Sequence, residues 1–217
     1  MKKFLVLSSW STAIGAVFIA AFALVGCDDC SSVSVRQNDE LVHEILTDIR
    51  DGQTYKTVTI GTQVWMAENL NYEMLGSFCY DDSAENCAKY GRLYTWTAAA
   101  EACPDSWHLP NNAEWETLFS AVGGKSTAGK VLKSQSGWYS DGNGTDAFGF
   151  SALSAGGRID HDEGAYFSNE GRYAYFWSAT VDERNPYYMR LHHSNEDALL
   201  STRDNDAAFS VRCVKDK

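Results

Sequence analysis

The chain has 217 residues, of which 44% are hydrophobic and 22% charged, with only 3 prolines, and this composition excludes a disordered or collagen-like chain. Its formal net charge is −11 at pH 7 and its lysines and arginines form no cluster, so nucleic acid is not an expected partner. A chain of this length can bury one well-formed core, so a single folded domain is predicted.

The first 26 residues are typical of a bacterial export signal. Lys2 and Lys3 form a basic start, and residues 13–25 form the uninterrupted apolar run. As a helix this run would extend about 20 Å, which is short of the roughly 30 Å hydrocarbon core of a bilayer. A removable signal peptide over residues 1–26 is therefore favoured over a permanent membrane span.

The apolar run ends at Leu24-Val25-Gly26-Cys27, which resembles the lipobox of bacterial lipoproteins. This resemblance implies cleavage before Cys27 and acylation of that cysteine, with palmitate-like chains that anchor the protein to a membrane. We therefore expect an exported protein, lipid-anchored to the cell envelope, at the outer membrane or cell surface rather than at the inner membrane. Residues 27–47 are polar and are predicted to be a lipidated tether, with a short helical turn over residues 39–46.

The folded domain is predicted to begin at residue 48 with a β-hairpin. Residues 55–60 alternate between apolar and polar side chains, Gly61 offers a turn, and residues 62–66 return as a second strand. A first helix is predicted over residues 92–102, which have high helix propensity and stop before Pro104. A second helix follows Asn111, because Asn111 and Glu114 resemble a capping box.

The C-terminal half is predicted to consist of short strands separated by loops rich in Gly, Asn and Asp. The strands are expected over residues 148–153, 173–179, 187–191 and 209–214. Helices early in the chain and strands late in it are typical of the α+β class.

The cysteines predict a disulfide framework. With Cys27 assigned to the lipid, Cys79, Cys87, Cys103 and Cys213 lie in the domain, and these four allow three pairings. Because an exported chain meets oxidising conditions, we predict a local disulfide between Cys79 and Cys87 and a long one between Cys103 and Cys213. Cys30 is then left over and is expected to be a free thiol, with an intermolecular disulfide as the alternative.

Several phrases in order along the chain resemble one family, the Fibrobacter succinogenes major paralogous domain. This resemblance spans residues 48 to 214 and implies one domain over residues 48–217, in an exported and often lipid-anchored surface protein whose activity is largely undefined. The phrases are Asp51-Gly-Gln-Thr-Tyr-Lys56, Ile60-Gly-Thr-Gln-Val-Trp-Met-Ala-Glu-Asn-Leu70, Tyr90-Gly-Arg-Leu-Tyr-Thr-Trp96, Cys103-Pro-Asp-Ser-Trp-His-Leu-Pro110, Gly149-Phe-Ser-Ala-Leu153 and Phe209-Ser-Val-Arg-Cys-Val214.

A more distant resemblance concerns the fold. Leu109-Pro-Asn-Asn-Ala-Glu-Trp115 is similar to a phrase of the sulfatase-modifying enzymes, which have a C-type-lectin-like fold. That fold implies two helices around a mixed, mostly antiparallel sheet, with the two ends of the domain close together. The reactive cysteine pair of those enzymes has no counterpart here, because the late Cys213 is assigned to a disulfide.

Catalysis, a metal and a cofactor are not expected. His108, His161, His192 and His193 show no spacing typical of a nucleophile or a metal site, and His192 and His193 are expected to point to opposite faces of a strand. The acidic stretches 141–146 and 204–206 lack the spacing of a calcium loop, so they are predicted to form turns.

Aromatic side chains are the remaining candidates for ligand contacts, because exposed rings can stack on sugars. Trp65, Trp96, Trp115 and Trp177 lie inside predicted elements and are expected in the core. The candidates for a ligand-binding surface are Trp138 and Tyr139, predicted to be an exposed pair, together with Tyr166, Tyr187 and Tyr188.

The predicted function is a non-catalytic surface module that binds an extracellular ligand, either a polysaccharide or a surface protein. This prediction depends on analogy between folds, and a fold does not determine a function. A structural envelope protein without a specific ligand, and an enzyme with an unrecognised site, are the alternatives.

Overall fold

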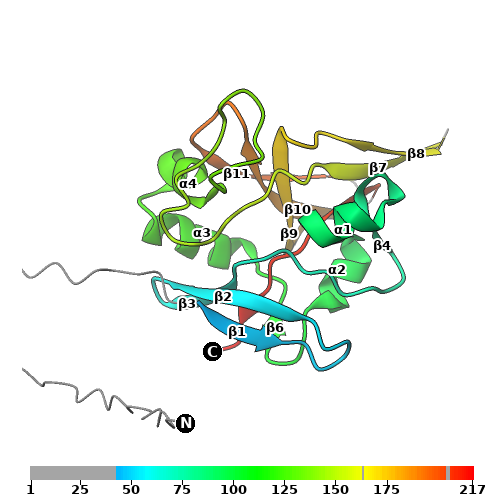
Figure 1. Ribbon diagram of the computed structural model, residues 1–217, viewed down its shortest axis with the longest axis horizontal. Coiled ribbons are helices and arrows are strands. Elements are labelled where there is room, and N and C mark those ends of the chain that lie inside the picture. Colours follow the sequence, from blue (N-terminus) through cyan, green and yellow to red (C-terminus); the bar gives the residue numbers. More distant parts are fainter. Residues whose placement is uncertain (1–42, 163, 204–205) are drawn as a thin grey trace, which may run out of the picture. The chain divides into compact units, whose positions relative to one another are not determined.

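The computed structural model describes residues 43–162, 164–203 and 206–217 (Figure 1), and all of them belong to one compact unit, Glu40–Lys217. The predicted signal peptide, Cys27, Cys30 and the tether up to residue 42 lie outside the described residues, as do Asp204 and Asn205. In the described ranges, no helix is long and apolar enough to cross a membrane.

The predicted N-terminal hairpin is confirmed. Strands β2 (Thr54–Ile60) and β3 (Gln63–Met66) pair antiparallel, and Gly61 in the turn between them has a φ of 60°, a left-handed conformation that suits glycine. Strand β1 (Glu44–Thr47) pairs with the other edge of β2. The predicted helical turn is therefore wrong at residues 44–46, and the tether ends before residue 47, because pairing with β2 satisfies backbone groups that an isolated turn leaves exposed.

The C-terminus completes this smaller sheet. Strand β13 (Val214–Lys215) lies between β3 and β6 (Trp107–His108), which gives the order β1-β2-β3-β13-β6. Figure 1 shows the blue and cyan N-terminal strands beside the red end of the chain. The two ends of the domain thus meet in one sheet, as the sequence comparison implied.

The larger sheet has eight strands, in the order β11-β10-β9-β12-β5-β4, with β7 paired to β12 and β8 paired to β7. Strand β9 runs parallel to β12 and the other pairs are antiparallel, so the sheet is mixed and mostly antiparallel. The strands are β4 (Ser77–Phe78), β5 (Leu93–Thr95), β7 (Gly157–His161), β8 (Gly164–Ser168), β9 (Tyr173–Asp182), β10 (Asn185–His192), β11 (Ala198–Thr202) and β12 (Ala207–Ser210).

Two of the four predicted C-terminal strands are confirmed, at β9 and β10. The predicted strand over residues 148–153 is wrong, since only Ala152 makes one isolated bridge, to Lys133. The carbonyls of Phe150 and Ser151 instead accept hydrogen bonds from Arg212. The predicted strand over residues 209–214 is divided, because Phe209 belongs to β12 in the larger sheet and Val214 to β13 in the smaller one.

The described part of the chain has four α-helices rather than the two that were predicted. They are α1 (Ala84–Tyr90), α2 (Trp96–Ala102), α3 (Asn112–Ala121) and α4 (Lys125–Leu132), and a short 3₁₀ helix precedes them at Tyr80–Asp82. The capping box that starts α3 is confirmed: the Asn111 side chain accepts from the Glu114 backbone N–H, and Glu114 accepts from that of Asn111.

The predicted first helix begins later than expected. Residues 93–95 pair with β12 as strand β5, and α2 starts only after Thr95, whose hydroxyl accepts from the backbone N–H of Ala98. The chain can extend here because β5 finds a partner strand, an interaction that helix propensity does not describe.

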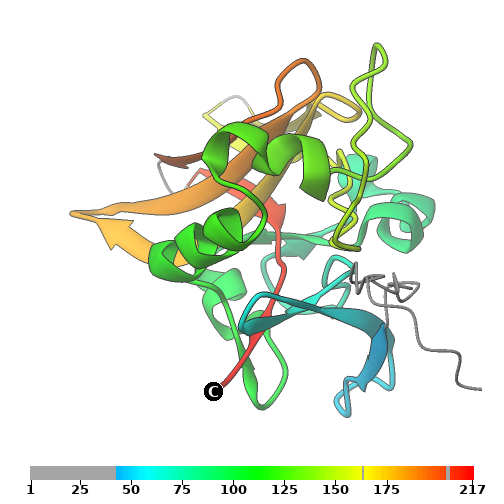
Figure 2. The ribbon, with the colours of Figure 1, turned by 90° about the vertical axis from the view of Figure 1, so that its left-hand side faces the viewer.

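Two hydrophobic clusters lie on opposite faces of β9 and β10. One lies between the two sheets, with α3 and α4 covering the strands (Figure 2), and it contains Trp65, Trp115, Phe150 and Phe176. The other contains Trp177, Phe209 and residues of α2. Trp65, Trp115 and Trp177 are fully buried and Trp96 is partly buried against the second cluster, as predicted.

Both predicted disulfides are present. Cys79 is bonded to Cys87 and so closes a loop over α1, and Cys103 at the end of α2 is bonded to Cys213 beside β13. The chain is therefore an α+β domain with mixed and antiparallel sheets and two disulfides.

A buried arginine joins three of the phrases that carry the family resemblance. The Arg212 guanidinium donates to Asn69 Oδ1 at 2.6 Å and to the Ser151 carbonyl at 2.8 Å, as well as to the carbonyl of Phe150. Burial lowers its pKa to about 9, so Arg212 remains charged at pH 7. These phrases therefore include residues that build the interior rather than a ligand site.

Candidate functional site

The predicted exposure of Trp138 is wrong. Trp138 is only 6% exposed, its indole N–H donates to Ser134 Oγ at 3.0 Å, and the Lys133 ammonium lies 5.1 Å from its ring centre. A ring this large is buried when its polar atom finds a partner inside the protein. Its neighbour Tyr139 is 54% exposed, as predicted.

The other tyrosine candidates lie on three strands. Tyr166 is 47% exposed on β8, Tyr187 lies half-buried on β10, and Tyr188 on the same strand packs against the second hydrophobic cluster. The structure brings Tyr188 and Tyr139 into one series of ring contacts, described below.

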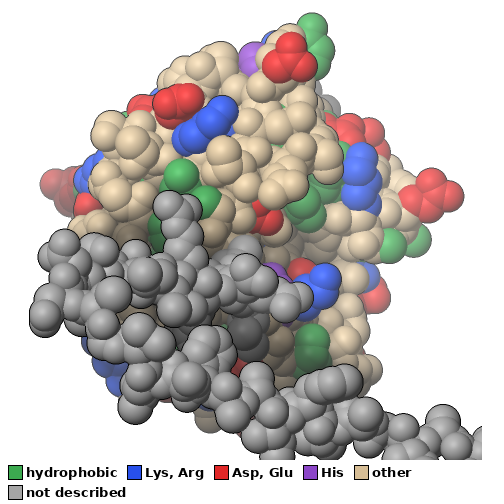
Figure 3. All heavy atoms as spheres, turned by 60° about the vertical axis from the view of Figure 1, so that its left-hand side comes forward, with side chains coloured by type: hydrophobic (Ala, Val, Ile, Leu, Met, Phe, Trp, Pro, Cys, Tyr) green, Lys and Arg blue, Asp and Glu red, His purple; other side chains and the backbone are tan. Residues whose placement is uncertain are grey.

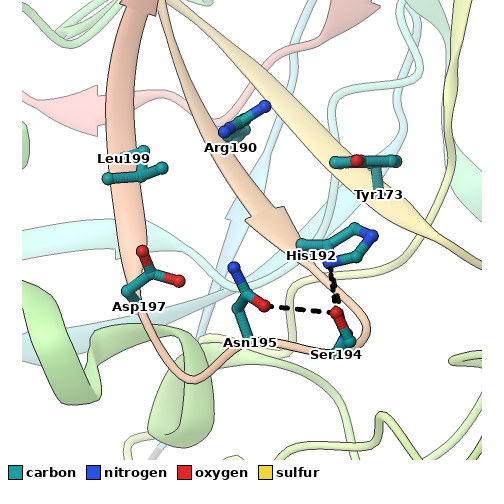
Figure 4. Close-up of a pocket in the computed structure, with 7 residues that line it drawn as sticks. All are labelled: Tyr173, Arg190, His192, Ser194, Asn195, Asp197 and Leu199. Atoms are coloured by element: carbon teal, nitrogen blue, oxygen red, sulfur yellow. Dashed lines mark hydrogen bonds between the residues drawn. The ribbon is translucent and has the colours of Figure 1, made fainter.

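A cavity of about 210 Å³ opens at the ends of β9, β10 and β11, around the turn that joins β10 to β11 (Figure 4). It is smaller than the roughly 300–1,000 Å³ that encloses a drug-sized ligand, so its size suits one ring-sized group. The residues that line it are Tyr173, Arg190, His192, Ser194, Asn195, Asp197 and Leu199.

The cavity collects polar groups without partners in the protein. Within the described ranges, the Arg190 guanidinium and the Asp197 carboxylate form no ion pair, and the Tyr173 hydroxyl and the Asn195 amide nitrogen have no hydrogen-bond partner. Figure 4 shows Asp197 and Asn195 facing each other across the hollow, with Arg190 farther along β10. One positive and one negative group make the lining nearly neutral overall, with free donors and acceptors.

His192 and Ser194 form a local pair in the cavity wall. Ser194 Oγ lies 2.8 Å from His192 Nδ1, and burial, followed by the neighbouring His193, lowers the pKa of His192. The ring is therefore neutral at pH 7, and the Ser194 hydroxyl also lies within hydrogen-bond distance of Asn195 Oδ1, to which it donates at 3.2 Å. Among the described residues, no carboxylate bonds the second ring nitrogen, so the pair lacks the orienting third group of a hydrolase triad.

A series of ring contacts, which we call the aromatic row, connects the cavity to Tyr139. Ring centres are 5.5 Å apart for Tyr139 and His193, and 4.3 Å apart both for His193 and His192 and for His192 and Tyr173. The two histidines were predicted to point to opposite faces of a strand. That prediction is wrong, because His193 lies beyond the end of β10.

The aromatic row continues from Tyr173 into the second hydrophobic cluster. Tyr173 and Tyr175 stack with ring centres 5.2 Å apart and planes 8° from parallel, and Tyr175 contacts Tyr188 at 5.8 Å. Sequence reasoning missed Tyr173, Tyr175 and His192. Their signal was the alternation of polar or aromatic residues with buried apolar ones along β9 and β10, which places every second residue on one face.

Lys133 stabilises the backbone of the cavity wall through hydrogen bonds. It is buried, and its ammonium donates to the carbonyls of His192 at 3.1 Å and Asn195 at 3.0 Å. Burial is the main cause of a lowered pKa for Lys133. The lysine therefore holds the backbone of the turn that carries most of the polar cavity residues.

Two glycines allow neighbouring segments to approach the same turn. A Cβ at Gly129 in α4 would lie 2.5 Å from the Asp197 carbonyl oxygen, and one at Gly142 would lie 2.3 Å from that of His193. Such contacts exclude any larger residue. The turn is therefore held between α4 and the loop after it, which limits its freedom to rearrange when a ligand binds.

Two further cavities, of about 380 and 190 Å³, flank α1 and share Gln53, Asn71 and Cys87. Charged groups there are already paired: Arg92 contacts Glu73 at 2.7 Å, and Glu68 accepts from the Lys56 backbone N–H. Within the described part of the chain, no group of three or more His, Cys, Asp or Glu residues is arranged to hold a metal. In the 141–146 stretch, Asp146 instead accepts from the Ser151 backbone N–H at 2.7 Å.

Charged side chains of both signs lie on one face of the molecule (Figure 3). On the face in Figure 3, acidic and basic side chains of the described residues are interspersed and form no broad basic area.

Comparison with known proteins gives one relationship. No curated protein and no solved structure matches this chain significantly. The sequence pattern of the Fibrobacter succinogenes major domain matches residues 58–215, which is most of the chain and nearly all of the described unit. The chain therefore belongs to the Fibrobacter succinogenes major domain family.

Proposed function

We propose that this protein is an exported, lipid-anchored surface module that binds an extracellular polysaccharide without chemical conversion, in the cavity between β10 and β11. One observation carries the proposal: among the described residues, the Arg190 guanidinium, the Asn195 amide nitrogen and the Asp197 carboxylate have no protein partner, and they line a rigidly supported hollow beside the Tyr173 ring. In a fold whose other polar groups are largely paired, this set is available to a ligand.

A sugar ring matches this lining chemically. Each sugar hydroxyl both donates and accepts, so the Asp197 carboxylate can accept from hydroxyls to which Asn195 and Arg190 donate. The apolar face of a sugar ring can pack on an aromatic side chain such as Tyr173. Because the charges of Arg190 and Asp197 balance, a neutral sugar suits the cavity better than an ion of either sign.

Export and lipidation remain part of the proposal. They are supported by the resemblance of residues 24–27 to a lipobox and by the two disulfides, which are typical of proteins in oxidising compartments. The C-type-lectin-like fold is likewise proposed, on the support of the mostly antiparallel sheet and of the meeting of both domain ends beside the disulfide to Cys213.

A glycan array tests the proposal directly, using protein that begins at residue 31 and so keeps the whole unit Glu40–Lys217. We expect selective retention of one class of polysaccharide, with at least about tenfold weaker binding by Tyr173→Ala and by Asp197→Asn, since each removes a central contact. Tyr166→Ala changes an exposed tyrosine that does not line the cavity, and serves as the matched control.

Two results on the array would contradict binding of a sugar in the cavity. If the protein retains no glycan selectively, or if both cavity variants bind as the unmodified protein does, the cavity is not a sugar site. A structural envelope role without a specific ligand is then favoured. Retention of a surface protein instead of a glycan would favour the protein-binding alternative.

A further inference from the structure

We infer that the ligand is a linear glycan, with one sugar in the cavity and the next over a second subsite formed by Tyr139 and Arg172. This inference rests on the proposed function and extends it from a single sugar to a chain of at least two linked sugars.

The second subsite has its own exposed ring and its own donor. Tyr139 is 54% exposed, and the Arg172 guanidinium lies over one face of its ring, 4.6 Å from the ring centre. Among the described residues, Arg172 forms no ion pair with a carboxylate. The opposite ring face can stack on a sugar, and the N–H groups of the guanidinium can donate to its hydroxyls.

The two subsites are neighbours. Tyr139 contacts His193, which contacts His192 in the cavity wall, with ring centres 5.5 and 4.3 Å apart. The backbone N–H of Tyr139 also donates to the Gly171 carbonyl at 2.7 Å. Gly171 lies in the turn before β9 and precedes the cavity residue Tyr173 by two positions, a separation of at most about 7 Å even in an extended chain. Adjacent sugars of one linear chain can therefore reach both subsites.

Their spacing is also held constant by the backbone. His193 donates its N–H to the Arg172 carbonyl at 2.8 Å, which ties the β10–β11 turn to the start of β9. The Gly142 contact with His193 ties the same turn to the loop that carries Tyr139. A preformed pair of subsites loses little conformational freedom on binding, so a second sugar adds affinity rather than only contact area.

The test is a length series. Sugars of the class retained on the array, from the monosaccharide to the hexasaccharide, are titrated into the protein that begins at residue 31. We expect affinity to rise from the monosaccharide to the short oligosaccharides and then to level off. Tyr139→Ala should weaken the oligosaccharides by about 2- to 10-fold while leaving the monosaccharide unchanged.

Tyr139→Phe keeps the ring and should restore oligosaccharide binding, whereas Tyr166→Ala should change neither end of the series. The inference is overturned if the monosaccharide binds as tightly as the hexasaccharide, or if Tyr139→Ala weakens both equally. Both results leave the cavity as a sugar site. Failure of every glycan at every length instead contradicts the proposed function itself.

Discussion

The buried Asp48 forms an ion pair with the partly exposed Arg50, which also bonds to a distant segment. Arg50 donates to both carboxylate oxygens of Asp48, at 2.9 and 2.6 Å, and to the carbonyl of Ala102 at the end of α2. The hydrogen bonds from Arg50 hold the pKa of Asp48 below its ordinary value, although burial opposes this. Folding is therefore linked to ionisation of this carboxyl.

We predict that Asp48→Asn lowers the free energy of unfolding at pH 7 by about 1.5–3 kcal/mol, the range for a hydrogen bond to a charged group. A depressed pKa contributes stability that is full above the ordinary value and is lost as pH falls through the lowered one. The difference between the two proteins should therefore shrink between pH 7 and pH 2 in urea titrations. A constant difference over that interval contradicts the assignment.

His108 joins β6, α3 and the C-terminal tail. Its two ring nitrogens lie 2.6 Å from an oxygen of Asp216 and 2.8 Å from one of Glu114. Burial is the largest single effect on its pKa and acts downward, but the hydrogen bonds to Asp216 and Glu114 together outweigh it and raise the pKa. The protonated ring is thus the form that folding favours.

A raised histidine pKa contributes stability below the ordinary value of about 6.5 that is lost as pH rises through the raised one. We expect His108→Gln to be less stable than the unmodified protein at pH 5, by under about 1 kcal/mol because the contacts are partly exposed. Near pH 9 the two should have nearly equal melting temperatures. An equal deficit at both pH values would show that lost packing, rather than lost charge, is responsible.

Among the elements, the β10–β11 turn depends most on residues remote in sequence. The Lys133 ammonium donates to two backbone carbonyls of this turn. Gly129 and Gly142 lack a side chain, so their segments can pack closely against the backbone of the turn. Because burial lowers the pKa of Lys133, the cost of desolvating its ammonium offsets much of what the hydrogen bonds contribute.

We predict that Lys133→Met changes the global free energy of unfolding by less than about 2 kcal/mol, while the turn amides of residues 193–197 exchange faster with deuterium. Glycan binding should also weaken, because this turn carries cavity side chains. Lys130→Met is the matched control, because the Lys130 ammonium only approaches the exposed Glu196 carboxylate, at 3.9 Å, and the substitution keeps the Lys130 backbone hydrogen bonds. Unchanged exchange in Lys133→Met would contradict the supporting role.

The elements also separate what local sequence can and cannot indicate. Helix α3 was predicted because its capping box lies within four consecutive residues, Asn111 to Glu114. Helices α1 and α4 were missed because each is short. Helix α4 also contains Gly129, a residue that disfavours a helix and is explained only by its close contact with the β10–β11 turn. Strand β1 was also missed, because its extended conformation depends on pairing with β2.

For the whole molecule, the disulfide from Cys103 to Cys213 closes a segment of 110 residues. On the chain-entropy model such a link contributes about 4.7 kcal/mol, against about 2.5 kcal/mol for the 8-residue separation of Cys79 and Cys87. We predict that Cys103→Ser with Cys213→Ser lowers the melting temperature by roughly 10 °C or more.

The matched control is Cys79→Ser with Cys87→Ser, which should cost clearly less in the same calorimetric scan. A larger loss for the short disulfide would mean that native packing around α1, rather than restriction of the unfolded chain, decides the contribution of these disulfides.

The sequence by itself determined the family, the α+β class, the opening hairpin, α3 and the buried state of Trp65, Trp115 and Trp177. These properties depend on the periodicity of hydrophobic residues, on helix caps and on short sequence motifs, each of which spans only a few residues. It also identified Tyr139 and Tyr188 as candidates, but not what connects them.

Only the tertiary structure decided that Trp138 is buried and that Tyr173, Arg190, Asn195 and Asp197 share one cavity. The reason is physical: the cluster that buries the Trp138 ring, and the position of Tyr173 beside the β10–β11 turn, depend on residues far away in sequence. Lys133 reaches Asn195 across 62 positions and Arg212 reaches Ser151 across 61, and no local pattern of residues encodes which distant backbone such a side chain will meet.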